Sequence, residues 1–508
     1  MATASRPRTA AIAFRGDGLT AKALRVLPAL AVILGVPVLL WLIYRPSYVN
    51  FDARYALLWA RDIVHGHTPD YTAVFAPTPH PLQTLVSFPV LLAGNGGAAK
   101  VMVALTLLAL GFLTWFVYRL GAELWHPAVG IVAALVVATR PSLDRFALIG
   151  YQDLAFAALV TYALLLETRK PKRGAPVLVT LAVAGLMRPD AWLLSLLYLA
   201  YLWRDTHNPS KRAQLIALAL SAPILWIAQD WIITGQPLHS LHGTKALAGE
   251  VDRRRPPLTI PKRTAWYYKL LLLWPAALAV PVGLVFAWFH ARKRFALLVA
   301  AALALTLWIV ITSVVGLSLI QRYLVTPGAL LAVVYGLGAL GWLKLKKQDR
   351  NIWAALGLLS LALSLAYIPA QTTKLKSINS TMRSEARNFA DLRLVGQSPA
   401  VRTRFKQCGN RISTIGHKAM PDLRWWLGAP PKSIDLVEGS KTKVGPLMLE
   451  PRATKQMWGF DRRNFAKVKP PAGYTRIYQN HSWTVYAAPG CGTGQLSAPP
   501  GGDIQSDD

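Results

Sequence analysis

Long apolar runs that alternate with short basic segments limit how this chain can fold. A helix needs about 20 mostly apolar residues to cross the hydrocarbon core of a bilayer. Runs near this length recur over the first three quarters of the 508 residues, and 53% of the chain is hydrophobic. The mean hydropathy of +0.34 is high for a soluble domain. We therefore predict an α-helical polytopic membrane protein.

The positive charge of the chain follows these apolar runs. The formal net charge is +32, which by itself would suggest a nucleic-acid partner. Many of the Lys and Arg residues, however, lie in short clusters between apolar runs, as the positive-inside rule requires. We therefore predict no nucleic-acid partner. The first run, residues 27–44, lacks a small-residue cleavage site, so we interpret it as an anchor behind a cytoplasmic tail of residues 1–26.

Loop charge also orients the runs. Placing the basic clusters inside gives about eleven transmembrane helices within residues 27–369, with the amino terminus inside and the carboxyl-terminal section outside. The predicted spans are residues 27–44, 100–118, 127–139, 153–167, 175–187, 191–203, 213–233, 266–290, 295–319, 324–342 and 352–369. Residues 81–93 are too short to span, and we predict an interfacial helix there.

One external loop departs from this charge pattern. Residues 234–265 contain Arg253, Arg254 and Arg255, which the positive-inside rule disfavours on the outside. Long loops follow the rule less strictly, so we keep the loop external. It either attracts an anionic lipid headgroup or acidic glycan or is an ordinary flexible loop.

The segment between the first span and the interfacial helix, residues 50–81, is more patterned than a simple spacer. Asp52 lies just beyond the point where the first span leaves the bilayer, and Tyr55, Trp59 and Ile63 then recur every four residues. Such a helix buries one face and exposes the other, as expected on a membrane surface. Glycine and several prolines then end it. We predict a further interfacial helix that begins near Asp52.

The carboxyl-terminal section differs in composition from the apolar part. Residues 370–491 contain no run long enough to span a bilayer. Residues 411–415, 433–437 and 474–487 are predicted strands because they are rich in β-branched and aromatic residues, and residues 380–394 are a predicted helix. We predict a small extracytoplasmic α+β domain, followed by a disordered tail of residues 492–508 that is rich in Gly, Ser, Pro and Asp.

The chain has two cysteines, Cys408 and Cys491, and both lie in this last section. Disulfides form and persist outside the cytoplasm. No cluster of other metal ligands accompanies the two cysteines, so they do not indicate a metal site. We therefore predict a disulfide between them.

Five polar groups are predicted to meet at the external face of the membrane, where an ion is costly unless it is paired or functional. They are Asp52, His80, Asp153, the Arg188-Pro189-Asp190 hinge and Arg322. Each has a structural alternative. The three acids can cap helices, Arg322 can be an interfacial arginine, and His80 can be a solvated loop residue. We interpret their convergence on one face as an active site.

Carboxylates and arginines together suit transfer from a phosphate-activated donor. Arg188 and Arg322 would bind the phosphate leaving group, since arginine binds phosphate bidentately. A carboxylate serves as the base for an incoming hydroxyl when the leaving group is good. A single displacement needs only one base. A second acid, such as Asp190, would then bind sugar hydroxyls, orient the base or hold a divalent cation (Mg or Mn), and the residues leave these roles open.

These features resemble the GT-C superfamily of polyprenyl-phosphate-sugar-dependent glycosyltransferases. The superfamily includes protein O-mannosyltransferases, the lipid A aminoarabinose transferase and the mycobacterial arabinofuranosyltransferases. The resemblance covers about residues 27–369. It rests on four short motifs in order: NFDARYALLWARDIVHG with Asp52, Pro79-His80-Pro81-Leu82, GYQDLAFAALVTY with Asp153, and Arg322-Tyr323-Leu324-Val325-Thr326-Pro327.

The resemblance implies a role for each motif. Asp52 would be the catalytic base and Asp153 its active-site partner, while Arg322 and His80 would face the lipid phosphate. Members of the superfamily often carry a paired acid in the first loop. Here Phe51 and Ala53 flank Asp52, so the resemblance implies no particular metal.

Several members also carry a soluble domain after the last span, often for acceptor recognition. In this chain Trp425 and Trp426, or Trp483, would stack on a sugar there, with packing in the domain core as the alternative.

We therefore predict an inverting glycosyltransferase of the cytoplasmic membrane. It would move a sugar from a polyprenyl monophosphate to a hydroxyl of an envelope glycan or lipid at the outer face. Three alternatives remain, one of which is a degenerate superfamily member that serves as a scaffold. A lipid-linked saccharide flippase or transporter would place charges near the midplane and often show repeated halves. A protein O-glycosyltransferase would use the same donor with a different acceptor.

Overall fold

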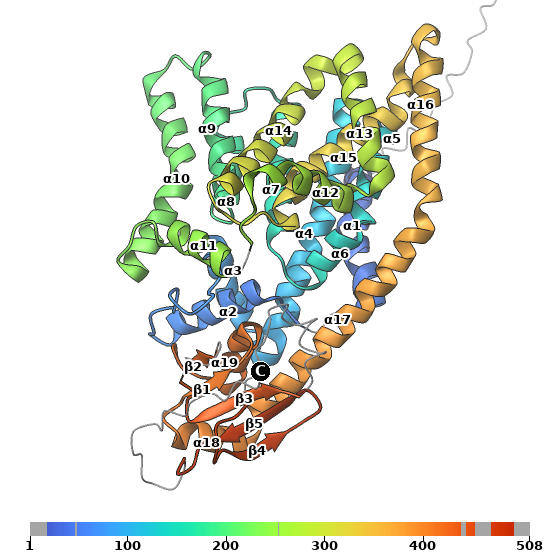
Figure 1. Cartoon of the computed structure of the whole chain (residues 1–508). Coiled ribbons are helices and arrows are strands. Elements are labelled where there is room, and N and C mark those ends of the chain that lie inside the picture. The colour runs from blue at the N-terminus through green and yellow to red at the C-terminus, as the bar shows by residue number, and fades with distance from the viewer. Residues whose placement is uncertain (1–17, 46–47, 252, 438–442, 453–468, 492–508) are drawn as a thin grey trace, which may run out of the picture.

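The computed structural model describes residues 18–45, 48–251, 253–437, 443–452 and 469–491. Figure 1 shows a large group of helices with a small sheet at one end, and the long helix α17 (Ile368–Gln397) runs between the two parts. Residues 1–17, and the predicted disordered tail of residues 492–508, lie outside the described residues.

The apolar part folds into helices joined by short turns. Their bounds are α1 Gly18–Tyr44, α2 Phe51–Val64, α3 Pro81–Leu91, α4 Gly94–Leu124, α5 Pro127–Ala138, α6 Pro141–Leu148, α7 Asp153–Arg169, α8 Ala175–Gly185, α9 Asp190–Trp203, α10 Pro209–Thr234, α11 His239–Glu250, α12 Ile260–Leu272, α13 Trp274–Phe286, α14 Arg292–Val314, α15 Val325–Leu340 and α16 Lys347–Ala366. Four short 3-10 or π turns join them: η1 Pro257–Thr259, η2 Ala287–Ala291, η3 Gln321–Leu324 and η4 Gly341–Lys344.

Within the described residues, five helical segments are long and apolar enough to cross a membrane. They are Val26–Tyr44, Gly94–Leu124, Pro209–Thr234, Ala279–Val314 and Gln321–Lys344. Two bent pairs, Pro127–Ala138 with Pro141–Leu148 and Gln348–Ala366 with Ile368–Gln397, raise the number to seven if each pair is one span. The prediction of a helical, multi-pass membrane protein is thereby confirmed, and the number of eleven spans stays a prediction.

Proline decides where several helices break. The predicted short runs on either side of the Arg188-Pro189-Asp190 hinge are two separate helices, α8 and α9. The single span predicted over residues 266–290 is wrong, because α12 ends at Leu272 and α13 begins at Trp274. Leu273 has a φ of 61°, and Pro275 has no amide hydrogen with which to continue the preceding helix. The predicted external loop of residues 234–265 also contains helix α11.

The carboxyl-terminal part contains a mixed five-stranded sheet with the order β2-β1-β3-β5-β4. The strands are β1 Ile412–Thr414, β2 Ile434–Leu436, β3 Leu447–Pro451, β4 Thr475–Gln479 and β5 Trp483–Ala487. Strand β1 pairs in parallel with β2 and β3, whereas β5 pairs antiparallel with β3 and β4. Helices α18 (Pro399–Gln407) and α19 (Met420–Leu427) accompany the sheet.

The predicted small α+β domain is therefore confirmed, with two differences in its strands. The predicted strand of residues 474–487 is a hairpin, because Asn480 turns the chain and bonds the backbone amides of Ser482 and Trp483. Strand β3 was missed because prolines lie next to it and at its end. The structure contains the predicted disulfide between Cys408 and Cys491, which joins the end of α18 to the residues after β5.

The segment of residues 50–81 packs into this domain. Phe75, from the turns between α2 and α3, belongs to the same buried cluster as Leu392, Phe405 and Trp483. Helix α2 also contacts α19 (Figure 1). The segment that carries Asp52 is therefore held between the apolar helices on one side and the sheet domain on the other.

Candidate active site

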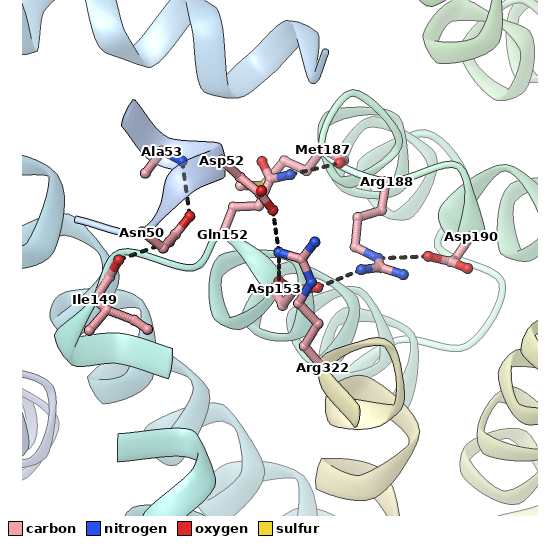
Figure 2. Close-up of polar contacts among 10 residues, drawn as sticks. All are labelled: Asn50, Asp52, Ala53, Ile149, Gln152, Asp153, Met187, Arg188, Asp190 and Arg322. Atoms are coloured by element: carbon pink, nitrogen blue, oxygen red, sulfur yellow. Dashed lines mark hydrogen bonds and ion pairs between the residues drawn. The ribbon is translucent and has the colours of Figure 1, made fainter. Parts of the chain in front are cut away.

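Asp52 lies in the first turn of α2, and its side chain does not cap the helix. The cap is Asn50, whose side chain accepts a hydrogen bond from the Ala53 amide at 3.0 Å. Asn50 also donates to the Ile149 carbonyl at 2.8 Å and thereby fixes the start of α2 to the loop before α7 (Figure 2). The capping alternative for Asp52 is thus excluded, and its carboxylate is available for another partner.

The partner of Asp52 is Arg322, from the turn before α15. Arg322 donates to Asp52, and the same nitrogen lies 3.9 Å from a carboxylate oxygen of Asp153. Arg188 pairs with the other oxygen of Asp153 at 2.5 Å and with Asp190 at 2.7 Å. Figure 2 shows the resulting chain of alternating charges, Asp52–Arg322–Asp153–Arg188–Asp190.

The five residues of this charge network differ in how far their side chains are exposed. The side chains of Asp52 and Arg322 are both 18% exposed, whereas that of Asp153 is 3% exposed. Asp153 and Asp190 each begin a helix, α7 and α9, but neither makes a side-chain cap. The structure therefore brings together five of the predicted site residues, and their ion pairs take the place of the capping alternatives.

Aromatic rings surround the two arginines. The guanidinium of Arg188 lies 4.2 Å from the centre of the Tyr323 ring, and that of Arg322 lies 4.7 Å from the Tyr151 ring. Such cation–π contacts hold a guanidinium plane in place without consuming its hydrogen-bond donors. Tyr151 belongs to the motif around Asp153, but the sequence offered no sign that its ring would face Arg322.

The pKa of Asp52 lies below its ordinary value. Burial alone would raise the pKa of this carboxyl, but the charge of Arg322 and the hydrogen bond from it outweigh the effect of burial. Asp52 is therefore ionised at neutral pH. Burial also raises the pKa of Tyr151, so that hydroxyl keeps its proton.

His80 lies beside this network but does not carry a charge. Burial lowers the pKa of His80 to about 3, and the charge of Asp52 offsets only part of that effect. The His80 ring contacts the Trp226 ring edge to face, with the two ring centres 5.6 Å apart. The Nδ1 atom of His80 is buried without a hydrogen-bond partner in the described structure. The predicted solvated-loop alternative does not apply. As a neutral ring, His80 has a single N–H, which can donate either to the Met187 backbone or to a phosphate, and it has no positive charge.

Arg253, from the segment between α11 and α12, acts on the same network. Its charge contributes to lowering the pKa of Asp52 and offsets a small part of the rise in the pKa of Tyr151. The run of three arginines was the signal in the sequence, but nothing in the sequence showed that it would lie near Asp52. The chain therefore supplies positive charge to Asp52 from two segments, the turn at Arg322 and the loop at Arg253.

The predicted sugar-stacking tryptophans lie elsewhere. Trp425 and Trp426 are buried in α19. The guanidinium of Arg54 lies 5.1 Å from Trp425 and 5.9 Å from Trp426, and that of Arg61 lies 4.9 Å from Trp425. Trp483 is also buried, and its indole donates to the Asn388 carbonyl. All three rings are packed in the protein interior, as the core-packing alternative states.

The three acids of the network do not form a metal site. No group of three or more His, Cys, Asp or Glu side chains in the described part of the chain is arranged to hold a metal ion. Asp52, Asp153 and Asp190 are each bound by an arginine instead. A divalent cation would have to displace these arginines, so the residues present do not fit one.

Comparisons with known proteins define the fold. No protein-family model and no curated protein matches this sequence. The structure is similar to ArnT from Cupriavidus metallidurans bound to undecaprenyl phosphate, with a TM-score of 0.55 at 14% sequence identity. The match covers 92% of this chain and 98% of that chain. The apo state of the same ArnT matches over equal shares at 14% identity, with a TM-score of 0.50.

The likeness at this identity concerns the fold. ArnT, a lipid A aminoarabinose transferase, belongs to the superfamily that the sequence motifs resemble, and this chain shares its fold. The resemblance stated from the sequence motifs is confirmed at this level. The match extends beyond the apolar helices to most of the chain, and so includes the carboxyl-terminal domain.

Proposed function

We propose that this protein is an inverting glycosyltransferase that uses a polyprenyl-monophosphate sugar as its donor. The observation that carries the proposal is the Asp52–Arg322 pair. A carboxylate that is not needed as a helix cap lies beside an arginine, a side chain suited to binding phosphate, in a fold shared with a protein bound to undecaprenyl phosphate. The acceptor would be a hydroxyl of an envelope glycan or lipid at the outer face of the cytoplasmic membrane.

The donor phosphate would bind where positive charge is already concentrated. Arg322 and Arg188 provide guanidinium groups that are held by Asp153, which is bound to Arg188 and close to Arg322. A donor phosphate that binds Arg322 would compete with Asp52 for it, because both are anions. Arg253 would add further positive charge from the loop, and the neutral His80 would donate a hydrogen bond.

The transfer itself would need one base. Asp52 would accept the proton of the acceptor hydroxyl while the oxygen of that hydroxyl attacks the anomeric carbon. The bond between the anomeric carbon and the phosphate oxygen breaks, and its electron pair stays on the released polyprenyl phosphate. Arg322 and Arg188 would stabilise the negative charge that develops there. One displacement at the anomeric carbon inverts its configuration.

Asp153 and Asp190 would position the cations. Asp153 contacts both arginines and is 3% exposed, so it is poorly placed to receive a substrate hydroxyl. Asp190 holds the other edge of Arg188. We assign Asp153 to orienting the arginines, and Asp190 to orienting Arg188 while its remaining oxygen is available to a sugar hydroxyl.

The proposal is tested with Asp52→Asn in the purified full-length protein, incubated with a panel of polyprenyl-phosphate sugars and a lipid and glycan extract of the envelope. We expect transfer to be lost while folding and binding of undecaprenyl phosphate remain. Asp349→Asn is the matched control, since Asp349 is exposed at the start of α16. Full transfer by Asp52→Asn would contradict the catalytic assignment.

A further inference from the structure

A hollow lies between the end of α1 and the middle of α17, outside the candidate active site. It is a groove of about 540 Å³. One wall is formed by the end of α1 and the residues just after it, and the other wall is formed by α17. The lining residues are Leu42, Ile43, Tyr44, Arg45 and Tyr48 on the first wall and Asn379, Met382, Arg383 and Ala386 on the second. Figure 1 shows α17 passing beside the end of α1 on its way to the sheet. The groove therefore exists only in the folded chain.

The α17 side of the groove carries a stripe of positive charge. Lys376, Ser380, Arg383 and Arg387 follow one another at intervals of four, three and four residues, which places them on one face of the helix. They line an adjoining hollow of about 350 Å³ that shares Arg383 with the groove. The two hollows together form a continuous cationic surface along α17.

The positive charge of this surface is not neutralised within the described part of the chain. Arg45, Lys376, Arg383 and Arg387 are exposed, and no carboxylate in the described residues pairs with them. The nearest acid in sequence, Glu385, is engaged instead. It accepts a hydrogen bond from Tyr48 at 2.5 Å and from Arg145 at 3.0 Å.

The groove begins where α1 leaves the apolar region. Segment Val26–Tyr44 is one of the candidate membrane spans, and its last turns expose Leu39, Leu42 and Ile43 by 54% to 59%. A lipid chain can lie along this exposed face while the cations of α17 lie at the level of the headgroups. On the predicted topology these cations lie outside and within about 20 residues of the last span, where the positive-inside rule disfavours them.

We propose that this groove binds the phosphate of an anionic membrane lipid that is distinct from the polyprenyl-phosphate donor. Arg45 and Arg383 supply the phosphate contacts in the groove, and Arg387 adds positive charge from the adjoining hollow, since guanidinium groups bind phosphate oxygens in pairs. Met382 and the end of α1 supply the apolar floor against which the lipid chains pack. A lipid fits this surface better than a soluble anion does, because a free phosphate would leave the apolar floor uncovered.

The position of the groove gives this lipid a role that rests on the proposed function. Tyr48 lines the groove and Asp52 follows four residues later, so their Cα atoms are at most about 14 Å apart. A lipid headgroup larger than phosphate spans a distance of this size. The lipid in the groove would therefore be the acceptor of the proposed transfer, while the donor phosphate binds at Arg322.

Lipid binding to the full-length protein in nanodiscs, followed by native mass spectrometry, tests the site. The probes are phosphatidylglycerol, phosphatidylcholine and undecaprenyl phosphate. We expect Arg383→Gln/Arg387→Gln to weaken phosphatidylglycerol binding by about tenfold or more, since charge-assisted contacts to phosphate are lost. Binding of undecaprenyl phosphate should change by less than about twofold, because Arg322 is intact. Lys406→Gln/Lys432→Gln removes the same charge from exposed positions of the sheet domain and should leave both affinities unchanged.

The outcomes separate the groove from its alternatives. Equal loss of phosphatidylglycerol in the groove and control variants would mean that net charge alone attracts the lipid, and it would overturn the site. Loss of undecaprenyl phosphate in the groove variant would mean that the groove holds the donor. The thermal unfolding midpoint of each variant shows that the protein remains folded.

The acceptor role has its own readout in the transfer assay. Arg383→Gln/Arg387→Gln should raise the KM for the acceptor lipid with the KM for the donor unchanged. Unchanged KM values for both substrates would overturn the acceptor role. If the wild-type protein transfers no sugar, the proposed function fails and the acceptor role fails with it, whereas the binding experiment still decides whether the groove is a lipid site.

Discussion

Helix α2 carries ion pairs on two faces, and the two sets differ in burial and in the pKa of their acids. On the side of the apolar helices, Asp52 pairs with Arg322, and both side chains are 18% exposed. On the side of the sheet domain, Arg54 pairs with Asp422 at 2.8 Å and Asp62 with Arg424 at 2.6 Å, and all four side chains are 3% to 6% exposed.

The acids respond to these surroundings in opposite directions. Arg322 holds the pKa of Asp52 below its ordinary value in spite of burial. Burial raises the pKa of Asp62 and of Asp422, and their arginines offset only part of that effect. A fully buried pair cannot exchange partners without leaving a charge unpaired. The domain-side pairs therefore suit a fixed joint, whereas the partly exposed Asp52–Arg322 pair can give way to a substrate.

The largest expected difference is between Asp52→Asn and Asp62→Asn, the same substitution in two different ion pairs of one helix. Asp52→Asn should lower the transfer rate by roughly 10²–10⁴-fold, the usual contribution of a general base, with little change in stability. Asp62→Asn leaves the charge of Arg424 buried and should lower the free energy of unfolding by about 3–5 kcal/mol. Transfer assays and thermal unfolding in detergent measure the two effects. Equal stability losses in both variants would remove the distinction between the faces.

A double substitution sharpens the assignment of the buried pair as a joint. Arg54→Met alone should lower the free energy of unfolding by about 3–5 kcal/mol, because Asp422 is left buried and unpaired. Arg54→Met/Asp422→Leu removes both charges and should recover most of that loss, since apolar replacements of a buried pair are often neutral. A double variant no more stable than the single one would show that the pair itself, and not merely the unpaired charge, holds the domain.

Arg322→Lys tests the exchangeable pair. Lysine keeps the charge but cannot bind a phosphate with two parallel hydrogen bonds. We expect the donor KM to rise by roughly 10-fold to 100-fold, in line with the loss of one or two charge-assisted contacts, while the unfolding midpoint changes little. Arg350→Lys, an exposed position on α16, is the matched control. Unchanged donor KM in Arg322→Lys would remove Arg322 from the donor site.

The pH dependence of transfer gives a smaller effect of known sign. The pKa of Asp52 is lowered by Arg322 from its ordinary value of 3.8, so the ionised form that accepts a proton persists as pH falls. We expect kcat/KM to stay constant from neutral pH down toward that value and to fall only below it. In Arg322→Gln the burial effect on the pKa of Asp52 is opposed only by weaker charges such as that of Arg253, so the acid limb should move to higher pH. A limb at the same pH in both proteins would show that Arg322 does not control Asp52.

The smallest expected effect is that of His80→Gln. Because burial lowers the pKa of His80 to about 3, the ring is neutral at physiological pH and contributes one hydrogen bond at most. We expect the donor KM to change by no more than about tenfold, since a neutral hydrogen bond contributes roughly 0.5–1.5 kcal/mol. A larger loss, comparable with that of Arg322→Lys, would show that His80 is charged when the donor is bound.

Local sequence patterns predicted much of the fold. The apolar runs gave the positions of most helices, and the proline hinge at Arg188-Pro189-Asp190 correctly separated α8 from α9. The strands β1 and β2 and the pairing of the two cysteines also followed from the sequence. These predictions succeed because burial in a bilayer, proline geometry and disulfide chemistry depend on residues close together in the chain or on very few residues.

Predictions that depended on distant partners were less complete. The sequence placed Asp52, Asp153, Asp190 and the two arginines on one face of the membrane, but it did not show which acid would bind which arginine. It also left Asp52 as a possible helix cap, a role that Asn50 fills through contacts with Ala53 and Ile149. Whether Asp52 or Asn50 caps α2 depends on where the loop before α7 lies.

The sequence by itself determined that this is a helical membrane protein with a small disulfide-linked domain, because hydropathy and charge are properties of each segment. Only the tertiary structure decided that α2 is held on both sides. Asp62 and Arg424 are separated by 362 residues, and Asp52 and Arg322 by 270. Nothing local in the chain encodes either pairing. Each forms because folding buries these charges together, where an unpaired ion would be strongly disfavoured.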